Sequence, residues 1–218
     1  MNIFIRIVRK MSRALMYTTR EKFYAEKRKA LTNSDFSVIS SDCFGGIACH
    51  NLGQRFNSPT VNLFFSHDGF LHFVNNLKEY LQAELVEIKD KSVPYPVGTL
   101  TYGENTIRID FMHYKTFDEA KEKWNARRTR VNFSNIYIIQ TVPKNLTKEH
   151  VEKFNALPYK HKLLITHEND YDCTCMVTHK MFSDEGYKPG GILEYRSYFS
   201  KDRFMDDIDY ISFFNDTL

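Results

Sequence analysis

The stretch Ser37–Asp68, SVISSDCFGGIACHNLGQRFNSPTVNLFFSHD, decides the fold. Two short apolar runs, at 36–41 and 60–65, have the length and composition that predict buried strands. A Cys-Phe-Gly-Gly sequence follows the first run, and a Ser-His-Asp sequence follows the second. Proteins of the α/β class bind ligands where strands end in such segments. The stretch therefore predicts an α/β fold and the location of its site.

Helices and strands alternate along the rest of the chain. Ser66 is a typical N-cap for a helix over 67–82, and Thr116 for one over 117–130. Two alternating runs within 97–112 surround a Tyr-Gly-Glu-Asn turn and predict a β-hairpin. The other expected elements are a helical or irregular segment at 47–56, strands at 135–140 and 162–166, a helix at 147–157 and a closing helix at 204–214. Helices between strands favour parallel pairing, so we expect one mixed, mostly parallel sheet.

Polar and titratable side chains follow most of the predicted strands. The carboxyl ends of parallel strands meet at one edge of a sheet, so these side chains are expected to lie together there. They are Asp42, Cys43, Gly45 and Gly46 after the first strand, Ser66, His67 and Asp68 after the second, His113, Tyr114 and Lys115 after the hairpin, then Thr141 and Lys144, and finally His167 and Glu168.

Three functions fit such an edge. The first is a transferase acting on a nucleotide-linked or phosphorylated sugar, with His113 or Asp68 as its general base. Its expected ligand- and phosphate-binding residues are Gly45, Gly46, Ser66, His67, Tyr114 and Lys115. The second is a thiol enzyme, an acyl transferase or hydrolase with Cys43 as nucleophile, because a helix N-terminus lowers the pKa of a thiol. The third is a non-catalytic binding or assembly subunit.

The cysteines do not indicate a disulfide scaffold or a metal site. Four cysteines, at 43, 49, 173 and 175, are too few to staple a chain of 218 residues, which favours reduced thiols in the cytoplasm. Cys173-Thr174-Cys175 with His179, and Cys49-His50, contain metal-ligand types without the paired spacing of a structural zinc site. We therefore predict no metal and no cofactor.

Residues 3–31 have the period of a basic amphipathic helix. At 100° per residue, Phe4, Val8, Met11 and Leu15 form one apolar stripe opposite a basic face. Residues 1–31 carry a net charge of +7, which leaves −4 for the rest of a chain whose net charge is +3. Either the helix is a peripheral anchor on an anionic membrane surface, or its stripe packs on the domain or on a second subunit. We set residues 1–33 apart from a single domain at 34–218, and the oligomeric state stays open.

The charge and hydropathy patterns exclude other classes of protein. The basic excess is confined to the first helix, so no nucleic-acid partner is predicted. No apolar run approaches the roughly 20 residues of a spanning helix. The short run at 3–7 is interrupted by Arg6 and lacks the cleavage site of a secretory signal. We expect a cytoplasmic protein whose first helix is a candidate contact with the inner face of the membrane.

Several motifs resemble, as a block and in order, a bacterial family of uncharacterised proteins labelled exopolysaccharide biosynthesis proteins. They are SDCFGG (41–46), FNSPTVNLFF (56–65), YPVGTL (95–100), DFMHYKTFDEAKEKWNARRTRVN (110–132) and FNALPYKHKLLITH (154–167). The resemblance covers about 34–170 and excludes the basic helix. It implies a three-layer, Rossmann-like α/β/α fold and a role in exopolysaccharide or capsule production. The residues of this chain within the motifs are Cys43, Gly45, Gly46, Asn57, Ser58, Pro59, His113, Tyr114, Lys115 and Trp124.

Overall fold

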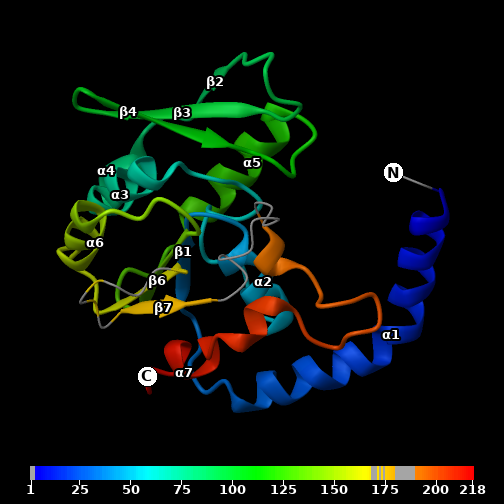
Figure 1. Cartoon of the computed structure of the whole chain (residues 1–218). Coiled ribbons are helices and arrows are strands. Elements are labelled where there is room, and N and C mark those ends of the chain that lie inside the picture. Colours follow the sequence, from blue (N-terminus) through cyan, green and yellow to red (C-terminus); the bar gives the residue numbers. More distant parts are fainter. Residues whose placement is uncertain (1–2, 168–170, 172, 174, 180–189) are drawn as a thin grey trace.

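Four strands of the described chain form a parallel sheet at the centre of the structure (Figure 1). The computed structural model describes residues 3–167, 171, 173, 175–179 and 190–218, with side chains from residue 7 onward. The strands lie in the order β1-β5-β6-β7, and each neighbouring pair is parallel. Their bounds are Ser37–Ser40 for β1, Ile136–Val142 for β5, His161–Thr166 for β6 and Met176–Thr178 for β7. The predicted parallel pairing is confirmed.

Helices cover both faces of this sheet, because side chains alternate between the two faces along each strand. Ile39, Ile138 and Leu164 belong to one buried cluster with α3 and α6. Val38, Ile139 and Leu163 belong to the other, with α2 and α7. The helices are α2 (Phe44–Asn51), α3 (His67–Asn75), α6 (Lys148–Asn155) and α7 (Tyr210–Phe214). The fold is therefore α/β, with three layers as expected.

The predicted hairpin is present, and it forms an antiparallel sheet of its own with β2. The segment 60–65, expected to be a strand, lies between the two sheets: Phe64 pairs with Asp110 of β4, and the Phe65 N–H donates to the Ser41 carbonyl of the β1 end at 2.9 Å. A left-handed backbone at Asn62, with φ of 64°, interrupts a regular ladder there. The elements here are β2 (Val86–Ile88), β3 (Val97–Tyr102), β4 (Asn105–Asp110), α4 (Leu77–Gln82) and α5 (Phe117–Arg128).

The observed starts of the helices agree with the sequence-based prediction more closely than their observed lengths do. The Ser66, Thr116 and Thr147 side chains each accept a hydrogen bond from a backbone N–H of the first turn, as caps do. The helix expected over 67–82 breaks at Asn76, whose ψ of 44° separates α3 from α4. The closing helix divides into the short helix η3 (Phe204–Asp207) and α7, after a turn at η2 (Gly191–Leu193).

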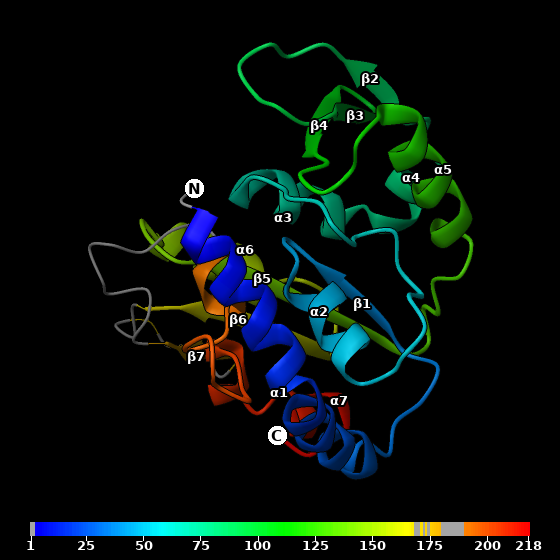
Figure 2. The ribbon, with the colours of Figure 1, turned by 90° about the vertical axis from the view of Figure 1, so that its right-hand side faces the viewer.

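The first helix, α1 (Ile3–Ala30), lies along the outside of the molecule, and its N-terminal end projects away from the sheets (Figure 1). Its second half packs beside α7, where the Asn215 side chain donates to the Ala30 carbonyl at 2.8 Å (Figure 2). In its first half, Met11 is 57% exposed and Leu15 is 67% exposed. Of the alternatives for this stripe, packing on the domain does not hold for Met11 and Leu15, whereas a membrane surface and a second subunit both stay open. No helix among the described residues is both long enough and apolar enough to cross a membrane.

Candidate functional site

Gly45 and Gly46 lie in the first turn of α2 rather than in an open loop. A Cβ atom on Gly45 would lie 2.7 Å from Val38 Cγ1, so glycine allows α2 to pack closely against β1. The Phe44 N–H donates to Asp42 Oδ1 at 2.9 Å, and the Gly45 N–H donates to Ser40 Oγ at 3.3 Å. The helix expected from residue 47 thus starts earlier, at Phe44, and the chain itself supplies acceptors for the N–H groups of Phe44 and Gly45.

Cys43 does not have the lowered pKa expected of a nucleophile at a helix start. Burial raises its pKa to about 12, with a further contribution from Asp42. Its Sγ lies 4.0 Å from the Leu63 carbonyl oxygen. A thiol with this pKa is protonated at neutral pH, and the thiolate is the reactive form. The expectation of a lowered pKa is wrong because burial outweighs the effect of the helix end.

Asp42 lies at the carboxyl end of β1, and it was not singled out as catalytic from the sequence. Burial raises the pKa of its carboxyl, opposed by the Phe44 N–H and by the hydroxyls of Thr141 and Ser40. Its position directly after a buried strand is the feature of the sequence that could have identified Asp42 as a candidate. Since it accepts the first N–H of α2, its evident role is to fix the start of that helix.

Asp68 meets a residue that the sequence did not indicate, His150 of α6. The Asp68 side chain is 84% exposed, and its Oδ1 lies 3.6 Å from His150 Nδ1. The rings of His150 and His67 lie edge to face, with 6.1 Å between their centres. Ser66, the cap of α3, sets the direction in which the His67 and Asp68 side chains leave the helix. His150 follows the cap of α6 by three residues, so two helix starts bring these side chains together.

Gln140, at the carboxyl end of β5, fixes the His150 ring. The His67 carbonyl oxygen accepts from the Gln140 amide nitrogen at 2.9 Å, so the amide oxygen of Gln140 must face the imidazole. This Oε1 lies 3.0 Å from His150 Nε2, which therefore carries the ring proton. In the neutral ring Nδ1 keeps its lone pair, and it is directed toward Asp68.

The histidine pair is held neutral. Burial lowers the pKa of His150, and His67 lowers it further, whereas Asp68 opposes both by favouring the cation. Burial also lowers the pKa of His67. Lys153 of α6 acts on His150 as a further positive charge, and its own pKa is raised by Glu149. At neutral pH the site thus presents an unprotonated Nδ1 of His150 next to the Asp68 side chain.

The turn His113-Tyr114-Lys115 lies away from this group. Segment 57–65 runs alongside β1, and β4 pairs with it in the opposite direction at Phe64 and Asp110. The chain after β4 therefore returns toward the amino end of β1. The buried Tyr114 hydroxyl donates to the Val61 carbonyl at 3.0 Å and accepts from Arg127, which ties the turn in place. His113 and Lys115 are exposed beside it.

A family model described as a domain of unknown function (DUF1919) matches residues 15–215. The chain belongs to this family. An uncharacterized protein of Haemophilus influenzae is 33% identical over 198 residues, which are 90% of this chain and 93% of that protein. The match extends on both sides of 34–170 and begins within α1. The expectation that the basic helix lies wholly outside the family is therefore wrong.

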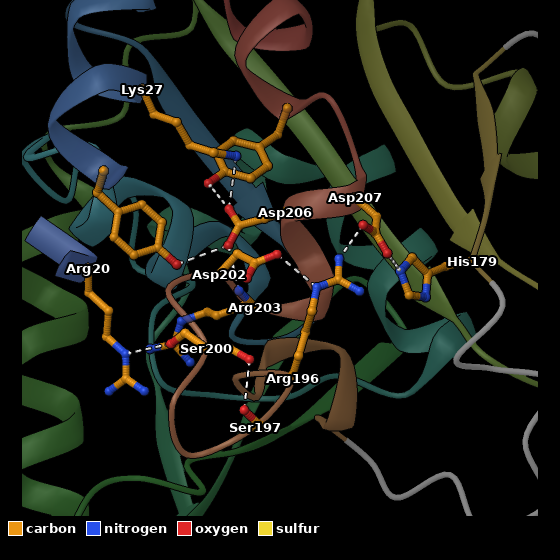
Figure 3. Close-up of polar contacts among 12 residues, drawn as sticks. Arg20, Lys27, His179, Arg196, Ser197, Ser200, Asp202, Arg203, Asp206 and Asp207 are labelled. Carbon is orange, nitrogen blue, oxygen red and sulfur yellow. Dashed lines mark hydrogen bonds and ion pairs between the residues drawn. The ribbon is translucent and has the colours of Figure 1, made fainter. Parts of the chain in front are cut away.

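The remaining candidates of this DUF1919 member lie elsewhere. Lys144 follows β5 and His167 follows β6 as expected, whereas Thr141 lies within β5 and is buried. Glu168 and Thr174 lie outside the described residues. The Cys173 and Cys175 sulfur atoms are 2.8 Å apart, and His179 bonds with Asp207 at 3.1 Å (Figure 3). Within the described ranges, no group of three His, Cys, Asp or Glu side chains is arranged to hold a metal ion.

Two cavities of this family member lie away from the carboxyl edge. One, of about 550 Å³, lies at the amino ends of β5 and β6, where Lys78, Lys160 and His161 line it. The other, of about 710 Å³, is a groove between α1 and the C-terminal segment. The carboxyl-edge site is thus a surface arrangement around Asp68, and the groove belongs to a different part of the molecule.

Proposed function

We propose that the protein is a transferase acting on a nucleotide-linked or phosphorylated sugar in exopolysaccharide or capsule biosynthesis. The observation that carries this proposal is the hydrogen-bonded chain from His67 through Gln140 to His150, whose Nδ1 faces the exposed Asp68 carboxylate. It supplies a neutral base with an anion beside it at the edge where α/β folds bind ligands. The choice of a sugar is supported by the resemblance of the sequence motifs to proteins labelled exopolysaccharide biosynthesis proteins.

In this reaction His150 is the general base. An acceptor hydroxyl gives its proton to Nδ1 as its oxygen bonds to the sugar carbon, and the bond from that carbon to the phosphate oxygen breaks. The leaving phosphate keeps the electron pair. The imidazolium that forms is stabilised by the Asp68 carboxylate, which lies 3.6 Å from Nδ1. Lys153, which is paired with Glu149 at 2.6 Å, is the cation beside His150 that the phosphate would approach.

The proposed general base is thus His150, in place of His113 or Asp68 as expected from the sequence. Asp68 keeps a role, as the group that stabilises the cation, and His67 supports Gln140 through its backbone. Cys43, Gly45 and Gly46 shape the start of α2, and His113 and Lys115 lie outside the proposed site. The alternative of a non-catalytic assembly subunit draws on a separate observation, the exposed stripe of α1.

The proposal is tested first by ligand binding. Melting temperatures are measured with nucleotide sugars, sugar 1-phosphates and lipid-linked sugar analogues. A true ligand at 100 times its Kd stabilises the fold by about 2.7 kcal/mol, which gives a visible shift. If no compound in the panel raises the melting temperature, the transferase proposal fails.

The second step separates chemistry from binding. With a ligand in hand, His150→Asn is expected to keep binding but to slow release of the nucleotide or phosphate by roughly 10²–10⁴-fold, the usual contribution of a general base. Asp68→Asn is expected to slow it less. Asp118→Asn, in the first turn of α5, is the control and leaves the rate unchanged. Equal rates for His150→Asn and the control would remove His150 from the mechanism.

A further inference from the structure

We propose that the outer ridge of α1, together with the groove beside it, is a docking surface for an anionic lipid bilayer. The outer ridge consists of Ile7, Met11, Leu15, Thr19 and Phe23, spaced four residues apart, so it winds around the helix by about 40° at each step, from the outward side toward the groove. This surface lies far from the Asp68 and His150 pair in the fold. The proposal therefore stands independently of the proposed reaction.

The first part of the ridge is apolar and uncovered. Ile7 is 51% exposed, Met11 57% and Leu15 67%, and they follow one another along the part of α1 that projects from the body (Figure 1). The opposite side of this part faces the chain, because Ser12 is buried and Arg9 lies over the Tyr198 ring at 5.9 Å. The helix is therefore oriented with its apolar side outward.

The second part of the ridge leads into the groove of about 710 Å³. Thr19 and Phe23 line one wall, and Lys201 and Ile211 of the C-terminal segment line the other. The Lys201 ammonium lies over the Phe23 ring at 5.3 Å. Three lysines and two carboxylates line the groove besides its apolar residues: Lys22, Lys27 and Lys201 with Glu26 and Asp209. Because the lysines outnumber the carboxylates, the groove suits a lipid, whose acyl chain is apolar and whose phosphate is anionic.

The charges favour a membrane over a second copy of the chain. Lys10, Arg13 and Lys22 are exposed on α1 and form no ion pair with the described part of the chain. Pairing two such helices would bring these cations together, whereas an anionic surface attracts them. Three exposed apolar side chains also fall short of the roughly 20–30 residues per side of a stable interface.

The docked half of α1 holds the surface in place. The Arg20 guanidinium donates to the Ser200 carbonyl oxygen at 3.0 Å (Figure 3). It also donates to the Tyr198 carbonyl oxygen and stacks on the Tyr195 ring at 3.6 Å. Lys27 is paired with Asp206 at 2.9 Å. These contacts fix the rotation of the helix about its axis, so its apolar side cannot turn inward without breaking them.

The test is sedimentation of the full-length chain with vesicles of phosphatidylcholine mixed with phosphatidylglycerol, and with vesicles of phosphatidylcholine alone. We expect binding to the mixed vesicles that weakens as salt is raised. Met11→Glu/Leu15→Glu is expected to lower binding roughly tenfold or more, because buried apolar side chains supply much of the free energy of partition. Lys10→Gln/Lys22→Gln is expected to lower it by roughly fivefold for each charge removed.

The matched control is Val86→Glu/Tyr102→Glu, which adds the same two charges at exposed apolar positions of the antiparallel sheet. It is expected to bind like the parent chain, and all variants are expected to melt at the same temperature because each altered side chain is exposed. Failure of the parent chain to bind mixed vesicles would overturn the proposal. Normal binding by Met11→Glu/Leu15→Glu would overturn it as well. A dimer of the parent chain that Met11→Glu/Leu15→Glu abolishes would also overturn it, because that result would assign the outer ridge to a second copy.

Discussion

Two aspartates, Asp206 and Asp68, show how differently one side chain is used in two regions of this molecule. The Asp206 side chain is 2% exposed and accepts from Tyr24 and Tyr210, with Lys27 at 2.9 Å (Figure 3). The Asp68 side chain is 84% exposed, and its ion-pair partner among the described residues, His150, lies at 3.6 Å. The first carboxylate is enclosed and fully bonded, whereas the second is open to a ligand.

The comparison teaches how to distinguish a structural polar group from a chemical one. Around Asp206, burial raises the pKa of Tyr24 and Tyr210, and the neighbouring carboxylate raises both further, so the phenols stay protonated as donors. The cluster ties α1 to η3 and α7. Next to Asp68, His150 Nδ1 has a lone pair and carries no proton that it could donate. A reactive site requires such an uncommitted lone pair next to solvent. The enclosed cluster around Asp206 has none.

Replacing the enclosed carboxylate should have the largest effect. Asp206→Ala leaves Lys27 and two tyrosine hydroxyls without their acceptor in a buried setting, so we expect a loss of about 3–5 kcal/mol in the free energy of unfolding. Urea denaturation measures it. Asp118→Ala, in the first turn of α5, serves as the control with a loss under about 1 kcal/mol. A similar small loss for Asp206→Ala would break the comparison.

A smaller effect is expected where α2 starts. Gly45→Ala places a methyl group 2.7 Å from Val38 Cγ1 and 2.9 Å from Ser40 Cβ, so we expect a loss of about 1–3 kcal/mol from overpacking. At Gly46 the nearest atom, Val61 Cγ1, is 3.2 Å away, and Gly46→Ala should cost less. Thermal denaturation of both variants checks the order. If Gly45→Ala melts like the parent chain, the glycine is not needed for packing and a ligand role returns.

The smallest effect is expected at the open site. Asp68 raises the pKa of His150, so Asp68→Asn should lower that pKa further, which an NMR titration of the imidazole measures. The unfolded ring takes a proton near pH 6.5, and the folded ring takes one only at lower pH. Unfolding therefore becomes easier as pH falls below about 6.5, and more so in Asp68→Asn. Stability at pH 8 should be unchanged, and an unshifted His150 pKa would show that the pair does not interact.

Patterns local in sequence were enough for part of this fold. The strands at 36–41, 135–140 and 162–166 and the caps at Ser66 and Thr116 follow from apolar runs and from side chains that accept a nearby N–H. These features depend on residues a few positions apart. The pairing of Phe64 with Asp110 depends on a distant element, which no local pattern contains.

The sequence by itself determined the α/β class and the parallel order of strands and helices, because periodicity and capping act over short distances. Tertiary structure alone decided that His150 faces Asp68, that the Tyr114 hydroxyl bonds to Val61, and that the apolar side of α1 faces outward. It also decided the pKa of Cys43, since burial depends on the whole fold. Pair distances and solvent exposure arise only when segments far apart in the chain pack together.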